Sequence, residues 1–162
     1  MPKLQIKLGG SGLYGPRNDQ RDRHVLQRIV AGDLRVAVVG IYLNAEYVRV
    51  DEDEAHQQKT TSLGVFPLVS AFHERGFYAQ LAYALGIDAG PLRKLTVYGR
   101  YDRRHAWFDG FTAITVDRIT GGLRLDLWEA VVLKAEYVDN RELRGAPTVA
   151  NNVFTSSLVY SW

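Results

Sequence analysis

The sequence predicts an all-β protein, an antiparallel up-and-down transmembrane β-barrel of about eight strands. Three observations lead to this fold class. Apolar and polar residues alternate with a period of two along most of the 162 residues, whereas helical periodicity is weak. The connections between the alternating stretches are short and long in turn. The chain also contains 9 Tyr and 15 Gly residues, a usage typical of strands that meet a membrane interface.

The alternation predicts eight strands in chain order, each bounded by turn-forming or polar residues. Their expected ranges are Lys3–Tyr14, Leu26–Ala37, Ile41–Val50, Gly76–Leu85, Leu92–Arg103, Ala113–Leu127, Val131–Asn140 and Val149–Trp162. No stretch of about 18 apolar residues is present, so the sequence contains no candidate transmembrane helix.

Every expected strand has an apolar face. These faces contain Leu4, Ile6, Leu8, Gly10, Gly12 and Tyr14 in the first strand; Leu34 and Val36 in the second; Ile41, Leu43, Ala45 and Tyr47 in the third; Phe77, Ala79, Leu81, Tyr83 and Leu85 in the fourth; Leu95, Val97, Gly99 and Tyr101 in the fifth; Ile119, Gly121, Leu123, Leu125 and Leu127 in the sixth; Leu133, Ala135 and Tyr137 in the seventh; and Phe154, Leu158, Tyr160 and Trp162 in the eighth. Alternation does not itself say which face is inside a barrel.

The connections alternate regularly in length. Short turns are expected at Val38–Gly40, Ile87–Pro91 and Trp128–Ala130. Longer polar loops are expected at Gly15–His24, Asp51–Gly76, Arg104–Thr112 and Arg141–Thr148. Long loops therefore follow the odd-numbered strands. Membrane barrels have this asymmetry, with short periplasmic turns and long outer loops, which places both termini of this chain on the periplasmic side.

One hairpin has a counterpart 90 residues further along the chain. The segment Leu43–Val48 matches Leu133–Val138, and Arg28-Ile29 matches Arg118-Ile119 at the same spacing. Two interpretations stay open: duplication of a strand–turn–strand unit, or similar residues selected by similar positions in a sheet.

Charges of both signs occupy the polar faces. The expected charge network consists of Asp33, Arg35, Glu46, Arg100, Asp102, Arg118, Arg124, Asp126, Lys134 and Glu136. A soluble barrel has an apolar interior, and a membrane barrel reverses that order. Opposite charges at similar depths on neighbouring strands indicate a lumen filled by charge pairs. The alternative is an ordinary solvated face.

Aromatic residues on the apolar faces lie mostly towards the expected strand ends. They are Tyr14, Tyr47, Tyr83, Tyr101, Tyr137, Tyr160 and Trp162. Such a placement is typical of the aromatic belts at a membrane interface. The last strand, up to Trp162, has no polar tail and would offer a sticky edge in a soluble protein. A closed barrel has no edge, because its last strand pairs with its first.

The final strand resembles the C-terminal strand of bacterial outer-membrane proteins, with Trp162, Tyr160, Leu158 and Phe154 at alternate positions. The segments Gly99–Phe108, Thr115–Arg124, Lys134–Tyr137 and Asn151–Ser157 resemble the closing strands of porin-type proteins. The resemblance implies a Gram-negative outer-membrane location, recognition of the last strand by the barrel-assembly machinery, and transport of small solutes. Porins of this type are longer, so the chain is expected to be either a single compact domain over residues 1–162 or the C-terminal portion of a larger barrel.

Bulk properties exclude several function classes. The formal net charge of +2 is too small to indicate a nucleic-acid-binding protein. The absence of cysteine excludes disulfides and thiolate metal sites. The first residues lack the features of a signal peptide, so a secreted barrel would be a mature form or a fragment. We expect no enzyme activity and no cofactor or metal, and we expect outer-membrane lipid or detergent as a partner, with oligomers allowed.

The same residues allow competing hypotheses about function. A barrel of eight strands has an interior just wide enough for side chains, so a monomer would be plugged. An open channel would need further strands, either from missing sequence or from other chains. In that channel Arg100, Arg118, Arg124 and Lys134 would favour anions; the alternative is that they only pair with carboxylates. A soluble lipocalin-like ligand-binding barrel would instead place Tyr, Leu and Val inside.

A lipid-modifying barrel enzyme is a third class, with its candidate residues in or near the outer loops. They are His24, His73, His105, Ser62 and Ser70. No spacing links these residues into a catalytic motif.

Three weaker signals lie in the expected loops. The run Asp51–Glu54 with His56 could bind a hard cation, although a solvated loop explains it as well. A basic rim of Arg17, Arg21, Arg23, Arg103 and Arg104 would pair with lipopolysaccharide phosphates or with solvent. The apolar segment Gly64–Val69 would enter the lumen, extend the fourth strand or contact another subunit.

Overall fold

The computed structural model describes residues 4–16, 25–53, 58–61, 64–67, 71–108, 112–145 and 149–160. All regular structure in these ranges is β-strand. The strands are β1 (Gln5–Pro16), β2 (Leu26–Val38), β3 (Ile41–Glu52), β4 (Gln58–Thr61), β5 (Gly64–Pro67), β6 (Phe72–Ala89), β7 (Leu92–Phe108), β8 (Ile114–Leu127), β9 (Val131–Arg144) and β10 (Val153–Tyr160). Within the described ranges, no helix is long and apolar enough to cross a membrane.

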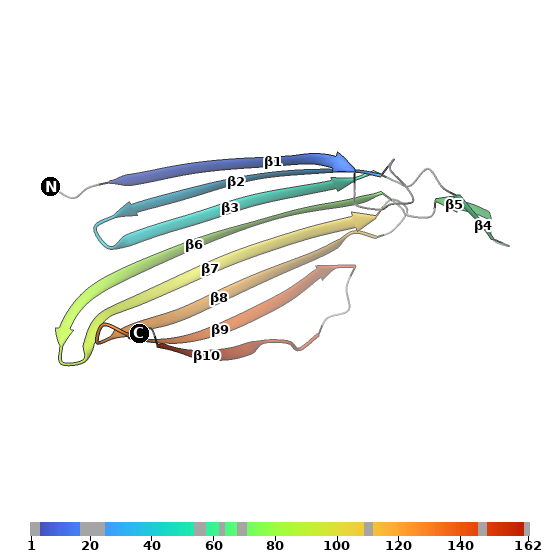
Figure 1. Ribbon diagram of the computed structural model, residues 1–162. Coiled ribbons are helices and arrows are strands. Elements are labelled where there is room, and N and C mark those ends of the chain that lie inside the picture. The colour runs from blue at the N-terminus through green and yellow to red at the C-terminus, as the bar shows by residue number, and fades with distance from the viewer. Residues whose placement is uncertain are drawn as a thin grey trace.

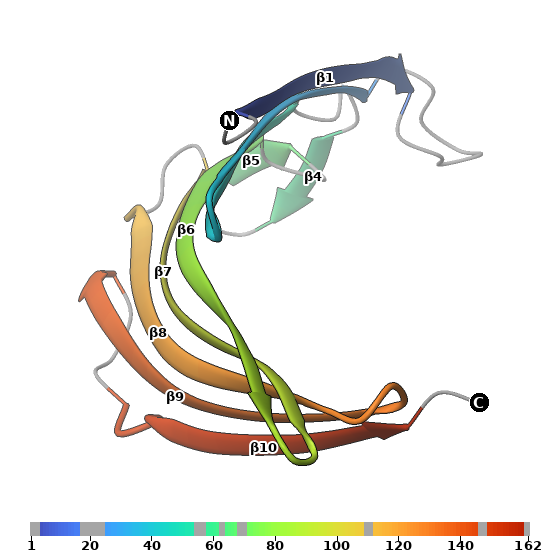
Figure 2. The ribbon, with the colours of Figure 1, turned by 90° about the vertical axis from the view of Figure 1, so that its left-hand side faces the viewer.

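Eight strands form one antiparallel sheet in the order β1-β2-β3-β6-β7-β8-β9-β10 (Figure 1). Each strand therefore pairs with its neighbour in the chain, apart from the separate β4–β5 hairpin between β3 and β6. This confirms the predicted all-β, up-and-down arrangement of eight strands. Viewed end-on, the sheet curves into an open C (Figure 2). In the described structure β1 pairs with β2 and β10 with β9, and the two edge strands do not meet.

The register places the two predicted faces correctly. Across the centre of the sheet Leu43 pairs with Leu81, Leu81 with Gly99 and Gly99 with Gly121. Directly paired residues point to the same side of a sheet, so the apolar residues of successive strands form one continuous face. The residues between them, at the intervening positions of each strand, are mostly polar and form the other face.

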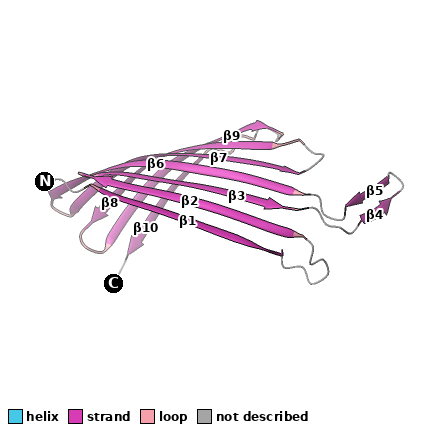
Figure 3. Ribbon diagram, turned by 90° about the horizontal axis from the view of Figure 1, so that it is seen from above, coloured by secondary structure: helices cyan, strands magenta, loops and turns pink. Residues whose placement is uncertain are grey.

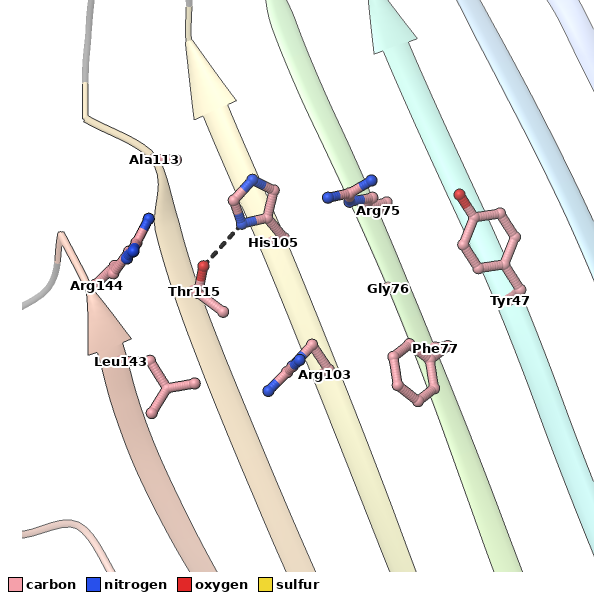
Figure 4. Close-up of a pocket in the computed structure, with 10 residues that line it drawn as sticks. All are labelled: Tyr47, Arg75, Gly76, Phe77, Arg103, His105, Ala113, Thr115, Leu143 and Arg144. Carbon is pink, nitrogen blue, oxygen red and sulfur yellow. Dashed lines mark hydrogen bonds between the residues drawn. The ribbon is translucent and has the colours of Figure 1, made fainter.

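The polar face is the concave one. Its residues are the less exposed, including Ala82 and Thr120, each 7% exposed, because side chains converge on the inside of a curved sheet. Apolar residues on the other face are open to the surroundings: Leu81 is 58% exposed and Leu158 is 67% exposed. Figure 4 views the sheet from this convex side. The described part thus has polar residues inside the curve and apolar residues outside.

Several strands extend beyond their predicted ranges. We expected loops to begin at Arg104 and Arg141, but β7 continues to Phe108 and β9 to Arg144. β6 begins at Phe72, within the predicted loop Asp51–Gly76. The sequence did not predict these extensions, because charged residues occupy both faces of the strands here. Backbone hydrogen bonds between strands continue even where apolar and polar side chains no longer alternate. As a result Tyr101 and Tyr137 lie in the middle of β7 and β9, not near the ends as predicted, whereas Tyr83 lies opposite Ile41, the first residue of β3.

The short turns lie at one end of the sheet and the long connections at the other, as the sequence predicted (Figure 1). The first residue of β1 and the last residue of β10 both lie at the short-turn end of the sheet. The turn between β2 and β3 has Val39 at φ 44° and Gly40 at φ 79°. These values match a type I′ hairpin turn, whose twist suits the flanking strands.

The 90-residue repeat holds for β3 and β9 but not for the strands before them. Tyr47 and Tyr137 both lie on the apolar face, whereas Arg28 lies on the apolar face and Arg118 on the polar face. The β8–β9 turn is one residue longer than the β2–β3 turn, and a shift of one residue exchanges the faces of a strand.

Part of the predicted apolar loop segment forms a strand. Within Gly64–Val69, the residues Gly64–Pro67 form β5, which pairs with β4 beyond the ends of the long strands (Figure 3). This arrangement differs from an extension of the fourth strand. Residues 68 and 69 lie outside the described residues.

Candidate functional site

The ten charged residues of the expected network all lie on the concave face. Register pairs place Asp33 opposite Glu46, Tyr78 opposite Asp102, and Asp102 opposite Arg118. On the next strands Arg124 lies opposite Lys134. The period of two is the reason, because residues separated by an even number along a strand share a face. The full set is Asp33, Arg35, Glu46, Arg100, Asp102, Arg118, Arg124, Asp126, Lys134 and Glu136.

Most ion pairs of the network run along strands. Arg100 donates from Nε to both carboxylate oxygens of Asp102 at 2.9 Å. Arg124 donates from Nε to Asp126 Oδ1 at 2.7 Å, and Lys134 Nζ lies 2.9 Å from Glu136 Oε2. Each of these three pairs joins residues i and i+2 of one strand. Asp126 also has a partner across strands, because Lys94 Nζ of β7 lies 3.6 Å from its Oδ2. The sequence predicted mixed-sign pairing on this face, and the structure places most of the contacts within strands because these long side chains extend along the strand direction.

Arg118 differs from Arg100, Arg124 and Lys134, the three paired cations of the network. Its Nε donates a hydrogen bond of 2.9 Å to the side-chain oxygen of Asn140, a neutral partner, although Asp102 lies opposite it in the register. In the part of the chain that the structure describes, Arg118 forms no ion pair. Its positive charge is therefore available to the space inside the curve.

Tyr98 anchors the centre of the network. Its phenol group lies over Gly122, where a Cβ atom would fall within 2.7 Å of two ring carbons and the hydroxyl oxygen, so only glycine leaves room for it. Lys134 Nζ lies 5.6 Å from the Tyr98 ring centroid. Arg100 stacks on the neighbouring Tyr78 at 4.0 Å from the ring centroid. These cation–π contacts hold two cations close to the sheet.

A groove of about 630 Å³ follows this network across β3, β6, β7, β8 and β9. Two carboxylates line it, those of Asp102 and Glu136. Five cations line it as well: Lys94, Arg100, Arg118, Arg124 and Lys134. Asp126 pairs with both Lys94 and Arg124, and with it included five cations face three carboxylates, so this part of the concave face is electropositive.

A second, smaller hollow of about 140 Å³ lies nearer the β1 edge. Asp33, Arg35 and Glu46 line it, and none of the three forms an ion pair with another described residue. A Cβ atom at Gly9 would lie 2.1 Å from Asp33 Oδ1, so Gly9 leaves space for this carboxylate. The two arms of the sheet thus carry different charge arrangements.

The predicted aromatic residues that are described all lie on the convex face. The sequence missed two further members: Phe77 pairs with Tyr47 in the register, and Phe154 pairs with Tyr137. Phe77 also meets Tyr101 edge-on, with ring centroids 5.8 Å apart. The upper aromatic row, on the side of the long connections, therefore consists of Tyr47, Phe77, Tyr101, Tyr137 and Phe154.

Aromatic residues also lie at the short-turn end. Tyr83 and Tyr160 face outward there, and Trp128 is 60% exposed in the turn between β8 and β9. The sequence predicts Trp128 only as a turn residue, although an aromatic residue next to a predicted strand end is itself a candidate for the aromatic belt. Tyr14 lies on the edge strand β1, and the guanidinium carbon of Arg28 is 5.9 Å from its ring centroid. The predicted aromatic residue Trp162 lies outside the described residues.

Beyond the upper aromatic row, the convex face becomes charged. Arg49 donates to Asp51 at 2.7 Å, and His73 Nδ1 lies 2.8 Å from the same carboxylate. The hydrogen bond from Arg49 in particular holds the pKa of Asp51 below its ordinary value of 3.8. Asp51 is thus engaged in an ion pair, which differs from a role in the suggested Asp51–Glu54 cation site. Glu54 and His56 lie outside the described residues.

The suggested basic rim does not form a single surface. Arg103 lies on the convex face and binds Asp117 through two hydrogen bonds of 2.7 Å. Arg104 lies on the concave face and donates to Glu74 at 2.9 Å. Consecutive strand residues point to opposite faces, which separates them. Arg17, Arg21 and Arg23 lie outside the described residues.

The two described candidates for lipid chemistry are engaged by neighbours. His73 contacts Asp51, and His105 Nδ1 lies 2.7 Å from Thr115 Oγ1. Trp107 packs against both imidazole rings, at centroid distances of 5.0 and 5.1 Å. His24, Ser62 and Ser70 lie outside the described residues. Among the residues the structure describes, no three His, Asp or Glu side chains are grouped so that they could hold a metal ion.

Comparisons with known proteins returned no relative. No protein-family model, no curated protein and no solved structure matches the chain. The functional argument therefore depends on the sequence and on the geometry described above.

Proposed function

We propose that this chain forms wall strands of a bacterial outer-membrane β-barrel, porin-like, with lipid on its convex face and solutes on its concave face. The observation that carries the proposal is the distribution of side chains over the curved sheet. Charges line the inside of the curve, whereas Leu, Val and aromatic residues stand exposed on the outside. Membrane barrels have this order, and a lipocalin-like carrier needs the reverse.

The dimensions of the apolar band support the same proposal. From Phe77 to Leu85, eight residue steps at about 3.3 Å cover about 26 Å along β6. At the strand tilt of about 40° usual in membrane barrels, this corresponds to about 20 Å across the membrane, close to the band of about 25 Å that such barrels present. Aromatic residues lie near both limits of the band.

The proposal requires that both sheet edges be paired. Unpaired backbone groups of β1 and β10 could not face lipid, since each would lose its hydrogen bonds there. We infer a closed ring in which these edges meet further strands. The long connections would lie outside the cell, both termini in the periplasm, and the last strand would be the segment read by the assembly machinery.

The electropositive groove favours a channel that prefers small anions. Field lines concentrate in clefts with low-dielectric walls, so five cations beside three carboxylates raise the local anion concentration. A purely structural barrel would use the same residues only as pairs. Arg118 distinguishes the two roles, because its partner Asn140 carries no charge.

Reconstitution into a planar bilayer tests this function. We expect stepwise conductance and, under a salt gradient, a reversal potential that indicates anion preference. Arg118→Gln should shift the reversal potential towards cation permeation, because it removes a charge from the groove. Arg28→Gln, which removes an equal charge from the convex face, should leave it unchanged. The absence of conductance steps would eliminate the channel and leave a structural barrel.

A further inference from the structure

A pocket of about 540 Å³ lies on the convex face, next to the upper aromatic row and towards the long connections (Figure 4). Its apolar part consists of Tyr47, Phe77 and Leu143. Cationic and polar side chains from β6, β7, β8 and β9 surround this apolar part, and they are Arg75, Arg103, His105, Thr115 and Arg144.

Several of these side chains belong to one row that crosses five strands. Arg49 pairs in the register with Arg75, Arg75 with His105, and His105 with Thr115. Thr115 in turn pairs with Arg144. Two arginines directly opposite each other on one face repel and destabilise a sheet unless an anion compensates them.

Carboxylates near the row are already paired with arginines other than Arg75 and Arg144. Asp51 binds Arg49, and Asp117 binds Arg103 while accepting a hydrogen bond from the Tyr101 hydroxyl. In contrast, neither Arg75 nor Arg144 forms an ion pair with any residue of the described part of the chain. The Arg75 guanidinium carbon lies 5.9 Å from the centroid of the Trp107 ring. Among the residues that the structure describes, these two guanidinium groups therefore have no carboxylate partner.

A β-bulge brings Arg144 into this row. Thr115 pairs with Arg144 but Val116 pairs with Glu142, so Leu143 is an extra residue in β9. Without it Arg144 would point to the concave face, since bulges re-aim the side chains that follow them. Gly145 ends the strand at φ 73°, where a Cβ atom would lie 2.4 Å from the Ala113 carbonyl oxygen. The local backbone thus places a cation and a leucine together on the outer face.

We propose that this pocket binds the phosphate-bearing headgroup of a membrane lipid, with Arg75 and Arg144 pairing with the phosphate and the acyl chains running down the apolar face. Arginine is well suited to phosphate, because its planar donors match the phosphate oxygens. The position supports a lipid over a free anion: the cations adjoin the aromatic row where headgroups would lie, and Phe77 and Leu143 extend the pocket towards the apolar band. This inference rests on the proposed outer-membrane location.

The test uses the folded chain in a neutral maltoside detergent and measures lipid binding by native mass spectrometry and by Trp fluorescence. The probes are dioleoyl phosphatidate, dioleoylglycerol, which has the same chains without phosphate, and inorganic phosphate, which has no chains. We expect phosphatidate to bind at least about tenfold more tightly than either of the other probes, as hydrogen bonds to charged groups contribute on that scale.

Variants locate the site. Arg75→Gln and Arg144→Gln should each weaken phosphatidate binding about five- to tenfold, and the double variant more. Arg28→Gln, a matched charge removal outside the pocket, should change binding less than about twofold. Equal binding of phosphatidate and dioleoylglycerol, binding of inorganic phosphate as tight as phosphatidate, or unchanged affinity in the double variant would each overturn the proposal.

Conductance and lipid binding can fail independently. If Arg75→Gln and Arg144→Gln leave phosphatidate binding intact while the wild type conducts ions, the headgroup site is wrong and the barrel stands. If lipid binding depends on both arginines but no conductance appears, the headgroup site stands and the channel is wrong.

Discussion

Glycine positions show how single residues shape both faces of the sheet. Gly121 and Gly122 are consecutive, so they point to opposite faces. Gly122 lies under the Tyr98 ring, whereas a Cβ atom at Gly121 would have no neighbour within 4 Å. The same residue type therefore has a packing role at one position and none at the next.

This contrast predicts different outcomes for one substitution at two neighbouring sites. Gly122→Ala should destabilise the fold by about 1–3 kcal/mol, because the added methyl group displaces the half-buried Tyr98 ring. Gly121→Ala should be neutral or stabilise slightly, by about 0.5 kcal/mol, since it only reduces the freedom of the unfolded chain. Urea unfolding followed by Trp fluorescence compares the two. Equal effects of the two variants would contradict the placement of Tyr98 over Gly122.

The β2–β3 turn contains a residue that its backbone does not favour. Val39 is β-branched yet has φ 44°, and it is 67% exposed, so little packing compensates for the strain. Val39→Asn should stabilise the protein by about 0.5–1 kcal/mol, because Asn-Gly is the preferred pair for a type I′ turn. Gly40→Ala should destabilise it, since its Cβ atom would lie 2.6 Å from the Ala84 carbonyl oxygen. Unfolding midpoints that move in the same direction for both variants would contradict this turn assignment.

At the scale of elements, side-chain contacts join β3 and β6 at the ends of these strands that lie towards the long connections, beyond the upper aromatic row. Asp51 is four residues past Tyr47 and receives hydrogen bonds from Arg49, with His73 of the next strand in contact. The side chain of Asp51 is 21% exposed and that of Arg49 is 55% exposed, so solvent screens much of the attraction.

The lowered pKa of Asp51 predicts a pH-dependent contribution to stability. A carboxylate whose pKa is lower in the folded than in the unfolded state stabilises the fold above its unfolded pKa of about 4, and this contribution disappears as the pH falls through the folded value. Asp51→Asn should therefore cost about 1 kcal/mol at pH 7 and little below about pH 3. Asp53→Asn is the control. That carboxylate is half-exposed and lies 3.7 Å from Arg28, so its ion pair is looser and its replacement should cost less than that of Asp51 at pH 7. A cost of Asp51→Asn that is constant from pH 7 to pH 3 would contradict the ion pair.

At the scale of the whole molecule, the even number of strands determines how the sheet can close. β1 and β10 run in opposite directions, because each of the seven steps across the sheet reverses direction. The β10 edge of one sheet can therefore pair with the β1 edge of another in the same antiparallel manner as the pairs inside the sheet. The C shape leaves the two edges of one chain apart (Figure 2).

This geometry predicts that two copies of the chain complete one ring in detergent. The polar faces would then line a shared lumen, wider than the side-chain-filled interior of an eight-stranded barrel. Native mass spectrometry should give a protein mass of twice 18.2 kDa. Protection of the β1 and β10 amides from hydrogen exchange should accompany it. A monomeric mass with both edges protected would indicate closure within one chain instead.

The sequence by itself determined which residues share a face, the order of the eight strands and the end at which each connection lies. These features are local: side chains alternate along a strand, and turn residues act within a few positions, so Leu81 and Arg100 could be assigned to opposite faces without a structure. The tertiary structure alone decided that the polar face is concave, that Arg100 pairs along its own strand with Asp102, and that the bulge at Leu143 turns Arg144 outward. It also left the sheet open. Those outcomes depend on the twist and register of strands distant in the chain, which alternation does not specify.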